Sequence, residues 1–202
     1  MGGIRSRQPR AALYSRGLAG REAHTDGFPG SMAAAGPKSG AEACMRPRSL
    51  DEFLTKSRIP YTTFRHAPAF TAMHAAAISH VRGRSWAKTV VCVADGEVVL
   101  AVVPAHYTID FEKLRPLTGA ASLRLATARE IVELYPDCEE GAMPPFGALY
   151  LQRVFVEECF VGDPEMVFNA GTHTDCFRMH YGDFVDIARP IVGRFSSPRH
   201  ES

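Results

Sequence analysis

The chain has 202 residues, of which 46% are hydrophobic and 22% charged, a composition typical of one soluble globular domain with a real core. No apolar run approaches the ~20 residues that a membrane helix needs. The net charge is +1, but eight of the 23 basic residues and only three of the 22 acidic ones lie in residues 1–48. The rest of the chain is therefore mildly acidic, which argues against a protein that coats duplex nucleic acid.

The sequence divides into three parts. Residues 1–48 are rich in Gly, Ala, Arg, Ser and Pro with little apolar periodicity, so we expect a disordered basic tail. Residues 49–195 carry the periodic apolar patterns of one ordered domain, and 196–202 are expected to be a flexible C-terminus. The five cysteines are widely spaced, odd in number and without a CxxC pair. They indicate a reducing, cytoplasmic setting rather than a disulfide framework or a structural zinc site.

The first half of the ordered part predicts helices and β-structure in alternation. A capping box of Ser49 and Glu52 begins a helix over 50–58, and a strand follows over 61–66. Thr71 can cap an alanine-rich helix over 72–79. The clearest hairpin pairs 87–94 with 97–103 around the type I′ signal Asp95-Gly96. Both of its strands are nearly continuous apolar runs, so we expect the hairpin to be covered on both faces.

One lysine interrupts this apolar hairpin. Lys88 stands at the start of the first strand, where a charged side chain is unusual. It can extend its ammonium group to the edge of the sheet, or it can point into a polar pocket. The pattern alone leaves both readings open.

The second half continues with Asp110 as the cap of a helix over 111–117. A second capping box at Thr127 and Glu130 leads a helix over 128–135 whose inward residues are predicted to be Ile131, Val132 and Leu134. Further predicted elements are a strand over 148–156, a β-pair of 166–170 with 176–180, and a helix over 182–188. Because hairpins dominate and strict βαβ alternation is lacking, we expect an α+β fold with a largely antiparallel, curled, barrel-like sheet and surrounding helices.

Within this second half, between the predicted helix over 128–135 and the strand over 148–156, lies a loop, Glu140–Gly147, with two glycines, two adjacent prolines and an aromatic residue. Neither a helix nor a central strand continues through Pro144-Pro145. The loop is either a tight connector or a rigid cradle whose backbone N–H groups approach a ligand. Its composition does not decide between the two.

Common catalytic and cofactor patterns are missing from the sequence. There is no HExxH, Walker or GxGxxG motif and no G-x-S-x-G nucleophile elbow. His74 and His80 are six residues apart and do not share a helix face, so we expect no metal site there. Among the thiols, Cys176 lies near His173 and stays a minor candidate nucleophile that lacks an orienting group.

From about residue 49 to 192 the chain resembles the YbaK/prolyl-tRNA synthetase-associated editing-domain family. The resemblance rests on a histidine after a strand, a threonine that starts an alanine-rich helix, a lysine that enters the hairpin, a loop of pattern G-x-x-x-P-[aromatic or aliphatic]-G, and a late glycine turn. In this sequence these features are His66, Thr71, Lys88, Gly141–Gly147 and Phe168-Asn-Ala-Gly171.

The resemblance implies an aminoacyl-tRNA deacylase that needs no cofactor or metal. Such a protein hydrolyses the ester between a wrong amino acid and the tRNA 3′ end, typically Cys or Ala on a proline tRNA. The expected partner is the acceptor end of aminoacyl-tRNA, with a cognate tRNA synthetase as a further candidate partner. The amino acid, the tRNA and the oligomeric state stay open.

The resemblance also implies roles for particular residues. Lys88 would bind oxygens of the terminal nucleotide or of the ester region as a point charge. The backbone of Gly141, Pro145 and Gly147 would hold the ester carbonyl, because N–H donors fixed by a rigid turn stabilise a developing oxyanion. The expected substrate-binding residues are Phe64, His66, Thr71, Met143, Phe146, Gly171 and His173. A protein that kept this fold as a non-catalytic binding module for an aminoacyl-nucleotide or a protein partner is the alternative.

Overall fold

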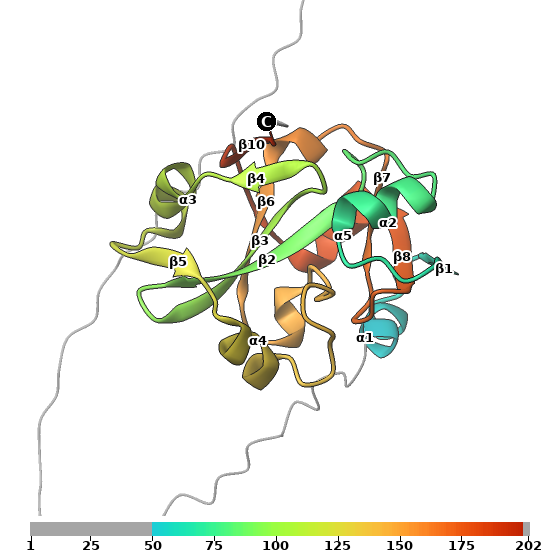
Figure 1. The fold of residues 1–202 in the computed structure, drawn as a ribbon, viewed down its shortest axis with the longest axis horizontal. Helices are drawn as coiled ribbons and strands as arrows, with labels where there is room; N and C mark the ends of the chain where they lie inside the picture. Colours follow the sequence, from blue (N-terminus) through green and yellow to red (C-terminus); the bar gives the residue numbers. More distant parts are fainter. Residues whose placement is uncertain (1–49, 200–202) are drawn as a thin grey trace, which may run out of the picture. The chain divides into compact units, whose positions relative to one another are not determined.

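The computed structural model describes residues 50–199, all within one compact unit of the chain. The predicted tail at 1–48, Ser49 of the first capping box and residues 200–202 lie outside the described residues. Within 50–199 the fold is mixed α+β, as expected (Figure 1). None of the helices in this part is both long and apolar enough to cross a membrane.

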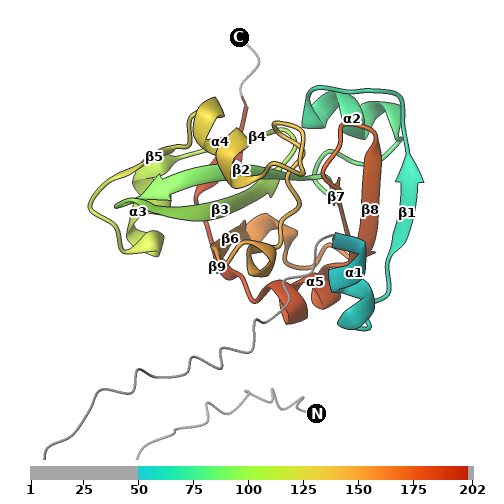
Figure 2. The same cartoon turned by 90° about the horizontal axis from the view of Figure 1, so that it is seen from below.

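The largest sheet has five strands and is built on the predicted hairpin (Figure 2). Ala87 pairs with Pro104 at one end, and at the other end Asp95 and Gly96 both have positive φ, as a type I′ turn requires. In sheet order the strands are β5 (Leu123–Leu125), β2 (Ala87–Ala94), β3 (Glu97–Pro104), β6 (Arg153–Glu157) and β9 (Ile191–Gly193). Most residues of β2 and β3 are buried, which confirms that the hairpin is covered on both faces.

Two smaller sheets complete the β-structure. One is antiparallel, with the order β1 (Thr62–Arg65), β8 (Asp175–His180) and β7 (Glu165–Asn169). The other pairs β4 (Tyr107–Ile109) with β10 (Ser196–Pro198). The pairing of β7 with β8 confirms the predicted β-pair.

Most strand pairs are antiparallel, as expected, but the expectation of a curled, barrel-like sheet is wrong. Within the described residues, three separate sheets form and none of them closes. In the central sheet β3–β6 and β6–β9 are parallel, because the chain leaves and returns through helices and loops before each of these strands. A hairpin-rich sequence does not reveal such non-local pairing.

Five helices accompany the sheets within residues 50–199: α1 (Leu50–Lys56), α2 (Ala72–Ile78), α3 (Phe111–Thr118), α4 (Ala128–Leu134) and α5 (Tyr181–Ala188). Thr71 caps α2, Asp110 caps α3, and Thr127 with Glu130 forms the predicted capping box of α4.

The prediction that Val132 of α4 faces inward is wrong, since 62% of this residue is exposed. Ile131 and Leu134 share the packed face, and Val132 lies a quarter-turn away from Ile131.

The strand predicted at 148–156 begins later than expected. Gly147–Leu149 is a 3₁₀ turn, and the N–H groups of Tyr150 and Gln152 both donate to the Gly147 carbonyl. Because of this tight turn, β6 begins only at Arg153.

Ser196–Pro198, expected in the flexible C-terminus, instead pairs with β4. The three-residue strands carry too little local pattern to be predicted and exist through their pairing.

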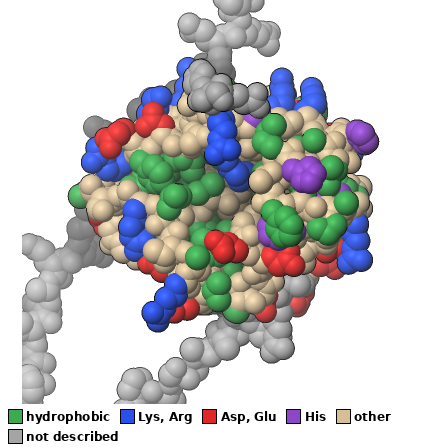
Figure 3. Space-filling view, in the orientation of Figure 1, with side chains coloured by type: hydrophobic (Ala, Val, Ile, Leu, Met, Phe, Trp, Pro, Cys, Tyr) green, Lys and Arg blue, Asp and Glu red, His purple; other side chains and the backbone are tan. Residues whose placement is uncertain are grey.

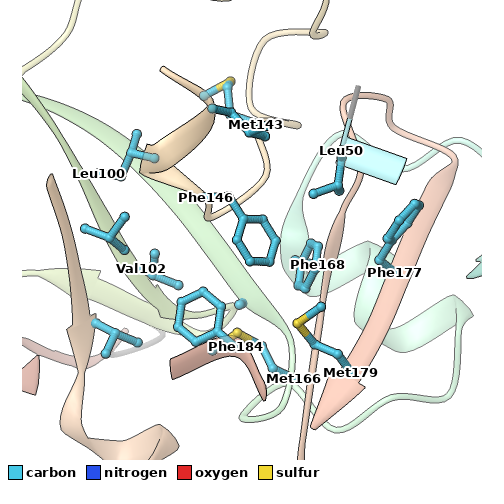
Figure 4. Close-up of a cluster of buried hydrophobic side chains, with 14 of the residues drawn as sticks. Leu50, Leu100, Val102, Met143, Phe146, Met166, Phe168, Phe177, Met179 and Phe184 are labelled. Carbon is cyan, nitrogen blue, oxygen red and sulfur yellow. The ribbon is translucent and has the colours of Figure 1, made fainter. Parts of the chain in front are cut away.

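The main core lies between the central sheet, the β1–β8–β7 sheet and the loop after α4 (Figure 4). Phe146 sits in its middle and is fully buried. Its ring lies edge-on to Phe168 and Phe184, with ring centroids 5.4 Å and 5.6 Å away. Such aromatic contacts add to the large apolar area that a buried ring removes from water. The core therefore fixes the loop at Phe146.

Candidate active site

A cavity of about 470 Å³ opens beside the start of β2. Residues of five segments line it: Phe70–Met73 at the start of α2, Trp86–Val91 of β2, Leu125 and Ala126 with Ile131 of α4, Glu140 with Gly141 and Met143 of the loop, and the pair Asn169 and His173. Arg199, after β10, lies at the same cavity. The cavity therefore collects residues from almost the whole length of the described chain.

Of the eleven residues predicted for the site, five line this cavity: Thr71, Lys88, Gly141, Met143 and His173. They come from α2, β2, the glycine–proline loop and the turn between β7 and β8. The other six are Phe64, His66, Pro145, Phe146, Gly147 and Gly171. We describe the two groups in turn.

Lys88 is half-buried, and its Nζ donates a hydrogen bond to the Tyr107 carbonyl of β4 at 2.7 Å. Its side chain points into a polar pocket, which is one of the two alternatives that the sequence left open. Burial lowers the pKa of Lys88, because it removes water from the charged form, and the nearby charge of Arg199 lowers it further.

The first part of the loop, Glu139–Met143, forms one wall of the cavity. Gly141 has φ +85°, a conformation that L-residues with side chains rarely adopt, and it is exposed. The Ala142 N–H donates to the Glu139 carbonyl. The N–H groups of Gly141 and Met143 make no hydrogen bond to another residue of 50–199. The Glu140 N–H likewise has no partner in this range, so three backbone donors are left for a ligand at this wall.

The second part of the loop, Pro144–Gly147, lies in the interior and does not line the cavity. Pro145 and Phe146 are buried. A Cβ added at Gly147 would stand 2.0 Å from the Gln152 carbonyl oxygen, so only glycine fits at this position. The structure therefore gives Pro145, Phe146 and Gly147 packing positions rather than positions at the cavity, because the adjoining core takes up this half of the loop.

The turn between β7 and β8 is joined to the first part of the loop by hydrogen bonds. The Glu139 N–H donates to the Gly171 carbonyl at 2.8 Å, and the Gly171 N–H donates to the Ala142 carbonyl at 2.9 Å. The His173 N–H donates to Glu139 Oε2 at 2.6 Å. Gly171, itself at φ +96°, is thus an anchor behind the cavity wall rather than part of its surface. These three hydrogen bonds fix the loop against the turn.

The His173 ring stands at the rim of the cavity. It packs against the ring of Phe70, with centroids 5.2 Å apart. Phe70 is 81% exposed, an unusual position for a large aromatic side chain. Thr71, next in sequence, is held by its capping role, since its Oγ1 accepts a hydrogen bond from the His74 N–H.

Phe64 and His66 lie outside the cavity. Phe64 is on β1, where the Arg178 guanidinium covers its ring. The His66 Nδ1 is 2.6 Å from the Ala67 carbonyl oxygen, and the His66 ring meets the edge of Trp86, which does line the cavity. His66 therefore supports the cavity from behind.

Cys176 does not provide a reactive thiolate. It is fully buried, and desolvation raises the pKa of its thiol to about 12. Its Sγ donates a weak hydrogen bond to Asn169 Oδ1 at 3.5 Å. At neutral pH the group stays protonated, so it is a packing residue beside the cavity.

Several cavity residues were not predicted from the sequence as site residues, among them Phe70, Trp86 and Arg199. Phe70 could have been noticed as an aromatic residue between Ala69 and the capping Thr71. Arg199 has no sequence signal, because it follows the last predicted helix and reaches the cavity only through β10. Within residues 50–199, no group of three or more His, Cys, Asp or Glu side chains is placed to hold a metal ion.

Several known proteins are similar to this chain in sequence or in fold. Proline–tRNA ligase of Nitratidesulfovibrio vulgaris (strain DP4) is 37% identical over 83 residues, which span 41% of this chain but only 14% of the ligase. A solved protein proposed to be a trans-editing enzyme for prolyl-tRNA synthetase matches with a TM-score of 0.61 at 25% identity, covering 68% of this chain and 87% of its own. The hypothetical protein APE2540 matches in fold with a TM-score of 0.67 at 21% identity, covering 73% of this chain and 98% of its own.

The family model of the aminoacyl-tRNA editing domain matches residues 66–187. This range contains α2, the central hairpin, the glycine–proline loop and the β7–β8 turn, and it confirms the resemblance found in the sequence. Because the match covers more than half of the chain, the protein belongs to the aminoacyl-tRNA editing domain family.

Proposed function

We propose that the protein is a trans-acting hydrolase that removes a wrong amino acid from the 3′ end of a tRNA. The observation that carries the proposal is the meeting of Lys88 and Gly141 at one cavity, although 52 residues separate them in the sequence. Membership of the editing-domain family supports the same activity. We further propose that the protein acts in the cytoplasm, together with aminoacylated tRNA.

The reaction needs a polarised ester carbonyl and a positioned water molecule. Water attacks the carbonyl carbon, and the negative charge that develops on the carbonyl oxygen is stabilised by the free N–H groups of Gly141 and Met143. The bond from the carbonyl carbon to the ribose oxygen then breaks, and that oxygen leaves with a proton. The products are the free amino acid and a tRNA with its hydroxyl restored.

Lys88 contributes a positive charge on the opposite wall. Its Nζ is held by the Tyr107 carbonyl, and the two remaining N–H groups of the ammonium can bind oxygens of the terminal nucleotide. An aminoacyl ester is already activated, so holding it against the loop and excluding bulk water can supply much of the rate. No side-chain nucleophile is needed in this scheme.

We propose Cys- or Ala-tRNA(Pro)-like molecules as substrates. The similarity to part of a proline–tRNA ligase supports proline tRNA. The cavity floor near the loop is apolar, with Ala87, Val91 and Met143, which fits a short uncharged side chain. Phe70 at the rim offers an exposed ring on which the terminal base can stack.

A panel of mischarged tRNAs tests this function. The purified protein is incubated with Ala-, Cys- and Ser-tRNA(Pro) and with correctly charged Pro-tRNA(Pro), and a mock preparation from cells without the gene controls for contaminating hydrolases. We expect release of at least one wrong amino acid and little release of proline. Failure to hydrolyse any member, with measurable binding of tRNA in the same cavity, would favour the non-catalytic binding module.

A further inference from the structure

Arg199 stands beside Lys88 although it follows the whole editing-domain match, which ends at residue 187. Its position is fixed by backbone pairing. β10 pairs with β4 through Ser196–Ile109 and Pro198–Tyr107, and the Arg199 N–H then donates to the His106 carbonyl at 2.8 Å. The same β4 strand holds Lys88 through the Tyr107 carbonyl. One short strand therefore positions both cations.

These two cations have no carboxylate partner within residues 50–199. Most other basic side chains of this part are paired, such as Arg194 with Glu158 and Arg84 with Asp163. Glu140 is the only acidic side chain at the cavity; it is exposed and forms no ion pair with either cation. Two like charges that share a partly enclosed cavity repel each other, and a bound anion removes that cost.

The distribution of charge on the surface also favours an anion site at this cavity. In Figure 3 basic side chains extend from the upper edge into the middle of the face that carries β2 and β4, with apolar groups on either side. The body of the protein is otherwise mildly acidic, so this is a local feature rather than a general affinity for anions.

We propose that Arg199 binds a phosphodiester of the tRNA 3′ end, next to the ester that Lys88 and Gly141 hold. This inference rests on the proposed function. A guanidinium group presents a planar fork of N–H donors that matches two oxygens of a phosphate, whereas an ammonium group acts as a point charge. The C-terminal strand β10 is thus part of the substrate site, and Arg199 extends recognition from the amino acid to the nucleic acid.

Removal of the phosphate contact tests the proposal. Deacylation of Ala-tRNA(Pro) is measured for wild type, Arg199→Ala and Arg199→Lys over a range of NaCl concentrations. Arg194→Ala is the matched control, since it lies in the same segment but outside this cavity and is paired with Glu158. We expect kcat/KM to fall about tenfold in Arg199→Ala. We also expect the slope of log(kcat/KM) against log[NaCl] to flatten by about 0.7, the value for one contact to a single strand.

A substrate without a phosphodiester shows whether Arg199 acts by binding phosphate or by supporting the structure of the site. On 3′-O-alanyl-adenosine, which carries the ester but no phosphodiester, Arg199→Ala is expected to match wild type. An equal loss on this compound and on the tRNA would overturn the proposal, because it would show a general effect on the site. An unchanged rate on Ala-tRNA(Pro) at every salt concentration would overturn it as well.

A binding measurement makes the inference independent of catalysis. An uncharged acceptor minihelix ending in CCA is titrated with wild type, Arg199→Ala and Arg194→Ala, followed by fluorescence anisotropy. We expect about tenfold weaker binding only for Arg199→Ala. If wild type hydrolyses nothing but shows this difference, the proposed function fails and the phosphate site stands. If wild type hydrolyses Ala-tRNA(Pro) and all three proteins bind equally, the phosphate site fails alone.

Discussion

The two halves of the glycine–proline loop each contain a glycine but lie in different environments. Glu139–Met143 lies at the cavity, with an exposed glycine at positive φ and three backbone N–H groups that have no partner within residues 50–199. Pro144–Gly147 lies in the core, with a fully buried aromatic ring and a glycine that touches β6. The second half holds the first in place, so a buried anchor and a cavity wall adjoin within nine residues.

The two glycines of the loop therefore have different structural roles. Gly147 is required because a side chain has no room there, and Gly141 is required because of its backbone conformation. Changes in the buried half should lower stability, and changes in the exposed half should lower activity. Substitutions in the two halves test this difference between stability and activity.

The largest effect is expected for Phe146→Ala. The change removes a fully buried ring from the contacts with Phe168 and Phe184 and leaves a cavity in the core. The free energy of unfolding should fall by about 4 kcal/mol. Urea denaturation followed by circular dichroism measures it; a loss below about 1 kcal/mol would show that the ring does not anchor the loop.

Gly147→Ala should lower the free energy of unfolding by about 3 kcal/mol, because its Cβ would meet the Gln152 carbonyl oxygen and the Val154 side chain. Gly182→Ala is the control: an added Cβ there has nothing within 4 Å, and the position lies in α5. That control should be neutral or slightly stabilising. Equal stability of the two variants in urea would refute the packing role of Gly147.

Gly141→Ala should separate activity from stability. An alanine at φ +85° costs about 1 kcal/mol of stability, since the left-handed region is strained for L-residues. The strain shifts the N–H groups at this wall, and we expect kcat/KM for Ala-tRNA(Pro) to fall at least tenfold. Thermal melting and deacylation are measured on the same sample. Full activity in this variant would remove Gly141 from the mechanism.

The smallest predicted effect is a shift in the titration of Lys88. Burial and then the charge of Arg199 lower its pKa, so the folded protein favours the neutral form more than the unfolded chain does. The cost of charging Lys88 in the folded protein is therefore fully present below the folded pKa, falls as the pH rises through it, and is gone above the pKa of the unfolded chain. In Arg199→Ala the pKa should rise but stay below its ordinary value, because burial remains.

NMR of ¹³C-labelled lysine measures this shift directly, and the chain has only four lysines, Lys38, Lys56, Lys88 and Lys113. Lys88→Ala identifies the resonance, and the remaining lysines serve as internal references. An identical Lys88 titration curve in wild type and Arg199→Ala would show that the two charges do not interact.

Local patterns allowed much of the fold to be predicted. The three helix caps, the type I′ hairpin and the β7–β8 pair all depend on residues close in sequence. The parallel pairs of β6 were not predicted, because their partner residues are 54 positions apart for β3–β6 and 36 for β6–β9 and leave no local signal. The open sheets follow from this non-local pairing.

The site was predictable only in part for the same reason. Lys88 attracted notice as a charge in an apolar strand, and Gly141 as part of a family pattern. That pattern does not distinguish a glycine at a cavity from one in the core, so Gly147 was placed at the site together with Gly141. Arg199 reaches the cavity through a three-residue strand pair and could not be found before the fold was known.

Single-turnover hydrolysis of Ala-tRNA(Pro) by Lys88→Ala tests the central claim most directly. Lys113→Ala is the control, because this lysine is exposed, is paired with Asp110 and lies outside the cavity. Thermal melting of each variant confirms folding. We predict that the rate constant falls at least about 100-fold in Lys88→Ala and stays unchanged in Lys113→Ala. A folded Lys88→Ala variant with a rate within about twofold of wild type, judged against the usual scale of such losses, would contradict the account.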